Sequence, residues 1–444
     1  MATNEKIVET QLVVQSYQRI NQNITSELLV HYTNTEVLNA LFENATFWAS
    51  NILYLNDSKE FFEGVKIINE VINSNKPTED NSNVRINDNG IKVEGGIYTI
   101  SFCAFNDELS QWITYAKESG VAIELDLDLL KYKPEDLTRK NEVCFYFVLE
   151  STQKGDNDKE KSEDEKTSYG PQHFCTADVL RKIEYGEKSG NAVQDMMKYN
   201  PSQEGGNKED YRLLASYIKN DNFSIENEIR ASFCYNQSSD GSVTKVNYKR
   251  LKSGVLRPFI KVQISIRNTS GEFEACLPLK TITVGPSGVQ QAVFDSVVHR
   301  IKYGKQKIYN YAEKDFQKFS RNFANYLEEV FKFEQENNLI SYKGKVAVCE
   351  RDSETNTGNK VMDLKVIDEE GKDNNDLAEF FKRLICCLNK HIIGKVSIKI
   401  NGNIISEDLT ESTKNDDDIK EISKNFYFTE EGVLIKKSKI PYIF

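Results

Sequence analysis

Four short runs of β-branched and aromatic residues between residues 228 and 284 constrain the fold of this chain more than any other feature. Their ranges are 228–235, 243–248, 259–266 and 281–284. Polar and turn-forming residues separate them, which is typical of short strands. Because these strands follow one another closely along the chain, they predict a largely antiparallel sheet.

Strand and helix patterns alternate before this sheet and continue after it. Further strands are predicted at 28–32, 47–50, 96–105, 121–125, 143–149, 395–406 and 432–442. Apolar residues at helical spacing predict helices after Thr33 or Thr35, from near Ser58, and at 109–116, 176–219, 288–302, 306–337 and 374–390. The polar segments 74–96 and 151–168 are expected to be surface loops. The sequence therefore predicts an α+β fold with helices flanking a mixed sheet.

The composition excludes several classes of protein. No apolar run approaches the length that crosses a bilayer, and the first residues lack the pattern of a secretory signal, so we expect a cytoplasmic chain with no membrane partner. Eight cysteines without a CxxC pair, beside four histidines, argue against a zinc site or a disulfide framework. We expect most of the cysteines to be small buried hydrophobic residues.

The charge balance bears on possible partners. A formal net charge of −11 opposes binding along a phosphate backbone unless basic residues cluster locally. One stretch contains such a cluster: Lys245, Lys249, Arg250, Lys252 and Arg257. This stretch has two interpretations, a nucleic acid contact or the solvated face of a strand.

Polar residues stand where the predicted strands end, although the signatures of P-loops, dinucleotide-binding turns, zinc proteases and α/β-hydrolases are absent from the sequence. These residues are His31, Tyr32, Ser50, Asn56, Asp57, Glu60, Ser101, Trp112, Tyr115, Glu124, Asp126, Lys219, Glu226, Glu228 and Arg230. Many have a structural alternative. Asn56 and Asp57 could cap a helix, Trp112 and Tyr115 could belong to a core, and His31 could be a buried histidine.

The segment Glu226-Asn227-Glu228-Ile229-Arg230 has the most suggestive spacing. If it is a strand throughout, Glu226, Glu228 and Arg230 share one face, because alternate residues of a strand point the same way. Three charged side chains on one face could also be an ordinary solvated surface. The sequence alone leaves both interpretations open.

Several of these segments, taken in order, resemble the uncharacterised bacterial family known as domain of unknown function twenty-nine seventy-one. The resemblance is carried by HYTNTEVLNALFENATFWASNILYLNDSKEF, YTISFCAFNDELSQWITYAKESGVAIELD, Lys219 with ENEIR, ITVGPS and the late KKSKIPY. Two features depart from the family: Ser58 replaces the usual proline after Asn-Asp, and the acidic stretch 151–168 is extra. The resemblance implies four segments: an N-terminal helical lead (1–27), a core (28–304), an inserted subdomain (305–425) and a C-terminal strand that returns to the core (426–444).

The resemblance also implies an ADP-ribosyltransferase-like core that consumes NAD, in a family often found in bacterial defence settings. In such folds a first-strand residue binds the adenosine-side ribose, an aromatic residue stacks on nicotinamide, and a late glutamate binds the other ribose. His31, Ser50 or Tyr54, and Glu228 stand in the matching order. Further NAD contacts would come from Tyr32, Asn56, Asp57, Trp112 and Tyr115.

Carboxylates suit this chemistry, because nicotinamide leaves as a neutral group and the ribose becomes an oxocarbenium-like cation. One carboxylate in a dry site can stabilise that positive charge. We expect Glu228 in this role, with Glu226 activating an acceptor and Arg230 holding phosphate or orienting a carboxylate. The product would be ADP-ribose on a macromolecule, protein or nucleic acid, as in a toxin.

Two other classes of function remain open at the level of sequence. Asp57, Glu60, Glu226 and Glu228 could converge to hold magnesium in a nuclease. Alternatively, the chain is a sensor or interaction module without catalysis, with a regulatory partner bound through 305–425. Magnesium dependence would favour the nuclease, and ligand binding without turnover would favour the module.

Overall fold

A computed structural model describes residues 28–55, 60–74, 96–116, 119–132, 143–152, 167–186, 213–234, 243–251, 253–268, 270–336, 344–348, 360–368, 370–393, 396–405 and 422–441. The predicted N-terminal lead (1–27) lies outside these ranges, as do most of the predicted loops 74–96 and 151–168. The chain divides into two units. Unit 1 contains the described parts of Met1–His31, Asn39–Asn106 and Asp126–Leu277, and unit 2 those of Tyr32–Leu38, Asp107–Leu125 and Pro278–Phe444.

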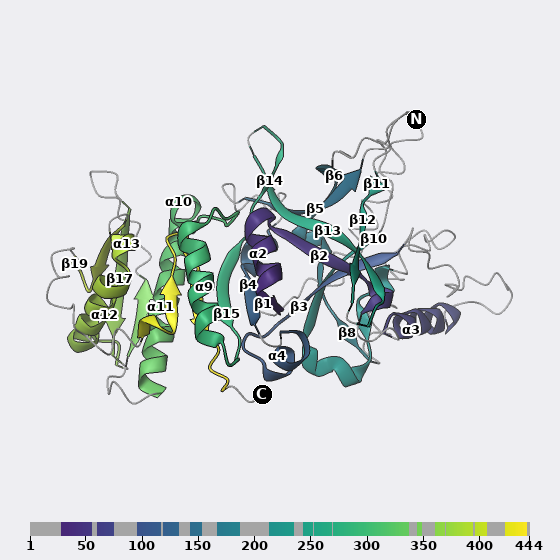
Figure 1. Cartoon of the computed structure of the whole chain (residues 1–444). Coiled ribbons are helices and arrows are strands. Elements are labelled where there is room, and N and C mark those ends of the chain that lie inside the picture. Colours follow the sequence, from purple (N-terminus) through teal and green to yellow (C-terminus); the bar gives the residue numbers. More distant parts are fainter. Residues whose placement is uncertain are drawn as a thin grey trace. The chain divides into compact units, whose positions relative to one another are not determined.

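Unit 1 is built on the antiparallel sheet that the clustered strand patterns predict. Its strands run in the order β11 (Val243–Thr244), β5 (Phe145–Thr152), β13 (Leu256–Arg267), β2 (Thr46–Asn51) and β3 (Ile97–Cys103). Further strands pair beside these: β6 (Thr167–Cys175), β7 (Leu180–Lys182), β10 (Glu228–Cys234), β12 (Val246–Arg250) and β14 (Phe273–Ala275). β13 is the longest and lies between β5 and β2 (Figure 1).

The sheet of unit 1 forks at β3. β10 pairs with β3 over its whole length, from Glu228 opposite Cys103 to Cys234 opposite Ile97. β2 pairs with the first half of β3, and β1 (Leu29–Asn34) pairs through Val30 with Cys103. Since a strand has only two edges, β1 and β2 must share the edge that β10 leaves open. Strands β1 and β2 therefore separate from each other beside Ile100 and Ser101 of β3.

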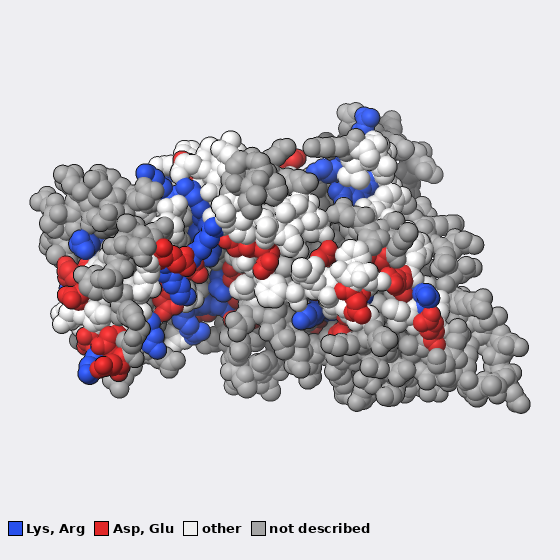
Figure 2. All heavy atoms as spheres, turned by 90° about the horizontal axis from the view of Figure 1, so that it is seen from below, with Lys and Arg blue, Asp and Glu red and all other residues white. Residues whose placement is uncertain are grey.

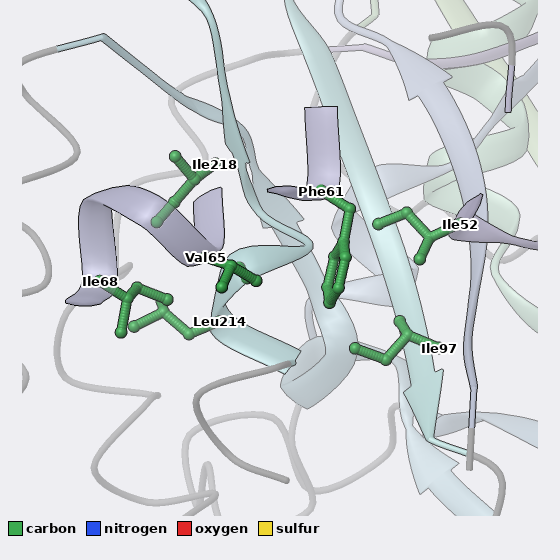
Figure 3. Close-up of a cluster of buried hydrophobic side chains, with 8 residues drawn as sticks. Ile52, Phe61, Val65, Ile68, Ile97, Leu214 and Ile218 are labelled. Carbon is green, nitrogen blue, oxygen red and sulfur yellow. The ribbon is translucent and has the colours of Figure 1, made fainter. Parts of the chain in front are cut away.

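An apolar cluster holds helix α3 (Glu60–Ser74) against the segment before β10. Ile52, Phe61, Val65, Ile68, Ile97, Leu214, Ala215 and Ile218 are all buried in it, and seven of them are labelled in Figure 3. Gly64 allows the close approach, because a Cβ there would lie 2.5 Å from the Ala215 carbonyl oxygen. The short strands β8 (Glu184–Tyr185) and β9 (Ile218–Lys219) pair in parallel beside this cluster.

In unit 2, strand β15 (Leu279–Val284) lies between two neighbouring strands. It pairs antiparallel with β4 (Gly120–Leu125) and in parallel with β21 (Leu434–Lys437), which in turn pairs with β20 (Phe426–Phe428). Helix α9 (Gln290–Tyr303) packs on β15 and β21, and α11 (Phe316–Glu336) follows the one-turn α10 (Tyr311–Lys314) (Figure 1).

A second sheet of unit 2 contains four strands in the order β16 (Lys345–Val348), β17 (Val361–Ile367), β18 (Ser397–Ile400) and β19 (Asn403–Ile405). Helix α12 (Asn375–Leu388) connects β17 to the parallel β18 through α13 (Lys390–Ile393). Unit 2 also contains the short helix α4 (Leu109–Tyr115). The short elements of unit 1 are α5 (Leu127–Leu130), α6 (Thr176–Val179) and the 3-10 turns η1 (Ile52–Tyr54) and η3 (Asp221–Glu226). Helix α2 (Thr35–Asn44) is divided by the boundary between the units.

The structure confirms the predicted mixed α+β fold, with a largely antiparallel open sheet and flanking helices. Three local predictions are wrong. The described part of 176–219 contains the strands β7, β8 and β9 beside the one-turn α6, instead of mainly helix, because the backbones of these strands pair with strands distant in sequence. The helix expected from 306 begins at Phe316 after a break. Neither Thr33 nor Thr35 caps α2, since the Asn34 side chain accepts the hydrogen bond from the backbone N–H of Val37.

The division into units also differs from the predicted domain organisation. Unit 2 includes the chain from Pro278 onward, so its boundary precedes the expected insertion at 305. The reason is that β15 pairs with β4 and β21, which tie 279–284 to the C-terminal part of the chain. Within the described ranges, no helix combines the length and the apolar character needed to cross a bilayer.

Candidate functional site: a buried charge cluster in unit 1

Five charged side chains of unit 1 meet in one buried cluster, here named the charge cluster: Glu60, Lys219, Glu226, Glu228 and Arg230. Lys219 Nζ lies 2.6 Å from carboxylate oxygens of Glu60 and Glu226 and 3.3 Å from Glu228 Oε2. Arg230 donates to Glu60 over 2.7 Å and to both oxygens of Glu228 over 2.6 and 2.9 Å. Three carboxylates against two cations leave a formal charge of −1.

The apolar cluster beneath explains how distant residues reach this point. Glu60 immediately precedes the buried Phe61, and Lys219 immediately follows the buried Ile218. Because Phe61 and Ile218 belong to the same buried cluster, the adjoining charged side chains are brought to the same edge of the core. Glu60 stands in the first turn of α3, and its carboxylate forms an ion pair with Lys219.

Glu228 and Arg230 reach the cluster from β10, where the alternation of a strand places them on one face. Glu226 lies outside β10, so the expectation that it belongs to the same strand as Glu228 and Arg230 is wrong. It is the last residue of η3, and Asn227 then adopts a left-handed conformation with φ of 42°. Asparagine tolerates this conformation better than most residues. The turn brings the Glu226 carboxylate back to Lys219.

The alternative of a solvated charged face is wrong for Glu228 and Arg230, which are 5% and 2% exposed. Further bonds fix them: the third guanidinium nitrogen of Arg230 donates to the Ser216 carbonyl over 2.8 Å, and the backbone N–H of Glu228 donates to the Tyr185 hydroxyl over 3.0 Å. Arg230 thus orients a carboxylate, one of the two roles expected for it. The second expected role, holding a phosphate, conflicts with these internal bonds.

The electrostatics of the carboxylates differ. Burial by itself would raise the pKa of Glu228, but the charges of Arg230 and Lys219 hold the pKa below its ordinary value. A side-chain hydrogen bond from Ser101 acts in the same direction. Burial raises the pKa of Glu226, and its bond to Lys219 offsets only part of this. The pKa of Glu228 is therefore held low and that of the more accessible Glu226 is raised, so Glu228 is the carboxylate kept as an anion.

The carboxylates converge as a magnesium site would require, but a lysine ammonium occupies their centre. Glu60, Glu226 and Glu228 all direct oxygens to Lys219 Nζ, and Arg230 takes the remaining positions on Glu60 and Glu228. Among the described residues, no group of histidine, cysteine or acidic side chains is arranged to hold a metal ion. Asp57, the fourth expected ligand, lies outside the described residues, as does Asn56.

Three hydroxyl residues lie on the same face of the sheet as Glu228 and Arg230. Ser50 and Ser232 both pair with Thr99, and Arg230 pairs with Ser101. Directly opposed residues of antiparallel strands share a face, so Ser50, Thr99 and Ser101 point to the face of the charge cluster. Ser101 is exposed, and Ser50 is half-buried. Within the described structure, the buried Thr99 Oγ1 has no hydrogen-bond partner.

His31 points to the opposite face and does not join Glu228. Val30 and Glu228 both pair with Cys103, so the next residue, His31, leaves the sheet on the other side. There its ring makes edge contacts with Phe47 and Phe102 at 5.2 and 5.7 Å between centroids. Burial lowers the pKa of His31, and its Nδ1 bonds to the Ser101 carbonyl oxygen over 3.0 Å. A neutral, packed histidine is the alternative that the sequence left open.

Three other expected NAD contacts belong to unit 2. Trp112 is 1% exposed, donates from Nε1 to Asp107 Oδ1 over 2.9 Å and packs edge-on against Tyr32. The Tyr32 hydroxyl accepts from the backbone N–H of Glu108. Of the two residues for which a core role was weighed against nicotinamide stacking, Trp112 has that role and Tyr115, 44% exposed, does not; Tyr32 is also buried. Tyr54, in η1 of unit 1, is half-buried.

Some members of the site carry no signal in the sequence. Tyr185 and Ser216 bond to Glu228 and Arg230, yet neither stands at the end of a predicted strand. Tyr185 enters through the short β8, inside the segment for which helix is predicted. Only the pairing of β8 with β9 places it there, and pairing between such short strands cannot be inferred from local periodicity.

In the basic stretch, Lys249 and Arg250 lie on β12 and Arg257 lies on β13. Lys249 Nζ lies 4.8 Å from the centre of the Trp48 ring, and Lys261 on the neighbouring strand pairs with Glu150. Lys252 lies outside the described residues. Figure 2 shows both basic and acidic side chains on the face of the molecule that is seen from below.

No protein-family model, curated protein or solved structure matches this chain. The family resemblance noted in the sequence is therefore carried by its motifs alone.

Proposed function

We propose that unit 1 has an ADP-ribosyltransferase-like fold that binds NAD on the face bearing the charge cluster and cleaves its nicotinamide–ribose bond. The observation that supports this most is the ionised, buried Glu228, which has a hydrogen bond from the exposed Ser101 and shares its face of the sheet with Ser50 and Thr99. Hydroxyl groups next to a fixed carboxylate suit the recognition of a ribose. The fork between β1 and β2 exposes Ser101 at this point.

The net charge of the charge cluster fits the proposed substrate. Nicotinamide in NAD carries a positive charge, and as it leaves with the bonding electron pair the ribose C1 becomes positive instead. A site with one excess negative charge stabilises both the bound NAD and the transition state. The stabilisation grows as the positive charge moves onto the sugar. Glu228 supplies a carboxylate that needs no reorganisation, because Arg230 holds both of its oxygens.

Glu226 completes the reaction as the group that accepts a proton. Water or an acceptor hydroxyl attacks C1, and its proton passes to the Glu226 carboxylate, whose raised pKa favours that transfer. With water the products are nicotinamide, ADP-ribose and a proton. With an acceptor, ADP-ribose is joined to a macromolecule, protein or nucleic acid, as the resemblance to bacterial defence effectors implies. His31 has no role in this scheme.

The test is nicotinamide release from NAD by the purified full chain, followed by chromatography. We expect Glu228→Gln to lower the rate by at least about a hundredfold, the usual cost of removing one electrostatic contact to a transition state. Glu150→Gln is the matched control, since Glu150 is also a buried glutamate of unit 1 paired with a lysine, Lys261. We expect this control to keep its activity.

Two results would count against the proposal. One is equal nicotinamide release by Glu228→Gln and by the wild type, when hydrogen exchange shows that both proteins are folded. The second is no nicotinamide release from the folded wild type with or without an acceptor lysate, which would favour an interaction module. Release of nucleotides from nucleic acid that requires magnesium would instead support the nuclease alternative.

A further inference from the structure

Two cysteines of unit 1 lie next to each other although the sequence gives no sign of pairing. Cys144 immediately precedes β5, and Cys175 ends β6 and precedes α6. Their Sγ atoms are 3.5 Å apart. The strand register explains the proximity, since Cys175 pairs with Tyr146, two residues beyond Cys144.

The surroundings of the two thiols differ from those of the buried cysteines. Both are half-buried, whereas Cys103 and Cys276 in the same unit are 4% and 5% exposed. The Tyr132 carbonyl oxygen lies 3.8 Å from each sulfur. The hydrogen bond from Cys175 lowers the pKa of Cys144, and the Arg267 guanidinium contributes in the same direction. Cys144 is therefore the better nucleophile of the pair.

We propose that Cys144 and Cys175 form an oxidation site, at which a small hydroperoxide converts the two adjacent thiols into a disulfide. The Cys144 thiolate attacks one oxygen of hydrogen peroxide, the O–O bond breaks, and the departing hydroxide takes a proton to become water. Cys175 then attacks the Cys144 sulfenic acid, the S–S bond forms, and the S–O oxygen leaves as a second water with the Cys175 proton. Both sulfurs are oxidised and the peroxide is reduced.

The short distance between the two sulfur atoms favours a disulfide between Cys144 and Cys175 over other pairings. A disulfide bond is about 2.05 Å long, so the sulfurs must close by roughly 1.5 Å, which side-chain rotation can supply. Cys103 is committed elsewhere, because its Sγ donates to the Glu226 carbonyl over 3.3 Å. This inference is independent of the NAD proposal, since neither cysteine belongs to the charge cluster.

The experiment uses the wild-type full chain treated with hydrogen peroxide, then alkylated and digested without reduction. We expect mass spectrometry to find the peptides of Cys144 and Cys175 joined, with the loss of one pair of hydrogen atoms and full reversal by dithiothreitol. Cys276→Ser is the control and should retain the cross-link. Cys144→Ser should abolish it and leave Cys175 open to alkylation.

Three outcomes would overturn the inference. The first is that peroxide leaves both thiols fully alkylatable at concentrations that oxidise free cysteine. The second is that Cys144 advances to sulfinic acid without a cross-link. The third is that either cysteine joins a different partner as readily. Because peptide mapping of the wild type decides among these, the result does not depend on whether Cys144→Ser folds.

Discussion

The charge cluster of unit 1 and the aromatic cluster of unit 2 are both largely buried, but one consists of charged side chains and the other of aromatic rings. The aromatic cluster comprises Phe319, Phe323, Tyr326 and Phe428, each at most 1% exposed. Its rings pack with centroids 5.1 to 5.8 Å apart. The charge cluster instead buries Lys219, Arg230 and two glutamates at 2% to 5% exposure.

The two clusters contribute to the free energy of folding in different ways. Burying aromatic rings stabilises a fold directly. Burying ions carries a large desolvation cost that their mutual attraction roughly cancels, and apolar residues of similar volume often serve stability as well or better. The charge cluster is therefore poorly explained by stability alone, which is the physical reason for assigning function to unit 1. The predictions below test that contrast.

The largest effect is expected for Arg230→Met. This change leaves the carboxylates of Glu60 and Glu228 buried without their main cation, and we expect unit 1 to lose about 3–5 kcal/mol of its free energy of unfolding. Hydrogen exchange of peptides covering β10 measures the loss, while peptides covering α11 in unit 2 should be unaffected. Lys436→Met removes the partly exposed pair with Glu329 and should cost at most about 1 kcal/mol. Equal costs for the two changes would contradict the comparison.

A smaller effect is expected in the aromatic cluster from Tyr326→Phe. The buried Asn389 donates to the Tyr326 hydroxyl over 3.3 Å, and burial raises the pKa of that hydroxyl to about 12. Removing the hydroxyl leaves a buried amide donor unpaired, which costs about 1–3 kcal/mol. Exchange of peptides covering α11 and α12 provides the measurement. Tyr303→Phe, at a residue that is 75% exposed, should change nothing.

The smallest effect is expected from acid, because two carboxylates of the charge cluster act in opposite directions. The lowered pKa of Glu228 means that its contribution to stability is present above the pKa of the unfolded chain and is lost as pH falls through the folded pKa. The raised pKa of Glu226 has the opposite sign, since protonation favours the folded state. A net decline in stability below about pH 4 should therefore be seen at β10, and Glu226→Gln should steepen it. A decline of the same size at α11 would show that the charge cluster is not its cause.

Much of the fold can be predicted from local patterns, because most strands and helices here carry their own periodicity. β2, β3, β4 and β10 lie where apolar runs predict them, as do α3 and α12. The exceptions are short strands such as β7 and β8, which form only through pairing with a distant partner. Their own residues carry no local preference strong enough to reveal them.

The site could be predicted only in part, for the same reason. Glu226, Glu228 and Arg230 are visible as a spacing, and Lys219 and Glu60 as polar residues near strand ends. That Lys219 lies among three carboxylates follows from the packing of Phe61 near Ile218, which no local pattern contains. The separation of His31 from Glu228 depends on the register between β1 and β3. A shift of one residue in that register would turn His31 to the face of the charge cluster.

The pairing of β15 with β21 has a consequence for how the chain is made. Thr281 pairs with Leu434, and the whole second sheet of unit 2 lies between them in sequence. On the ribosome, β15 emerges long before its parallel neighbour exists, so one edge of that strand stays unpaired while the intervening chain is synthesised. An unpaired strand edge is a place where chains join one another. Co-translational binding of chaperones should therefore concentrate on nascent chains that contain β15 but lack β21.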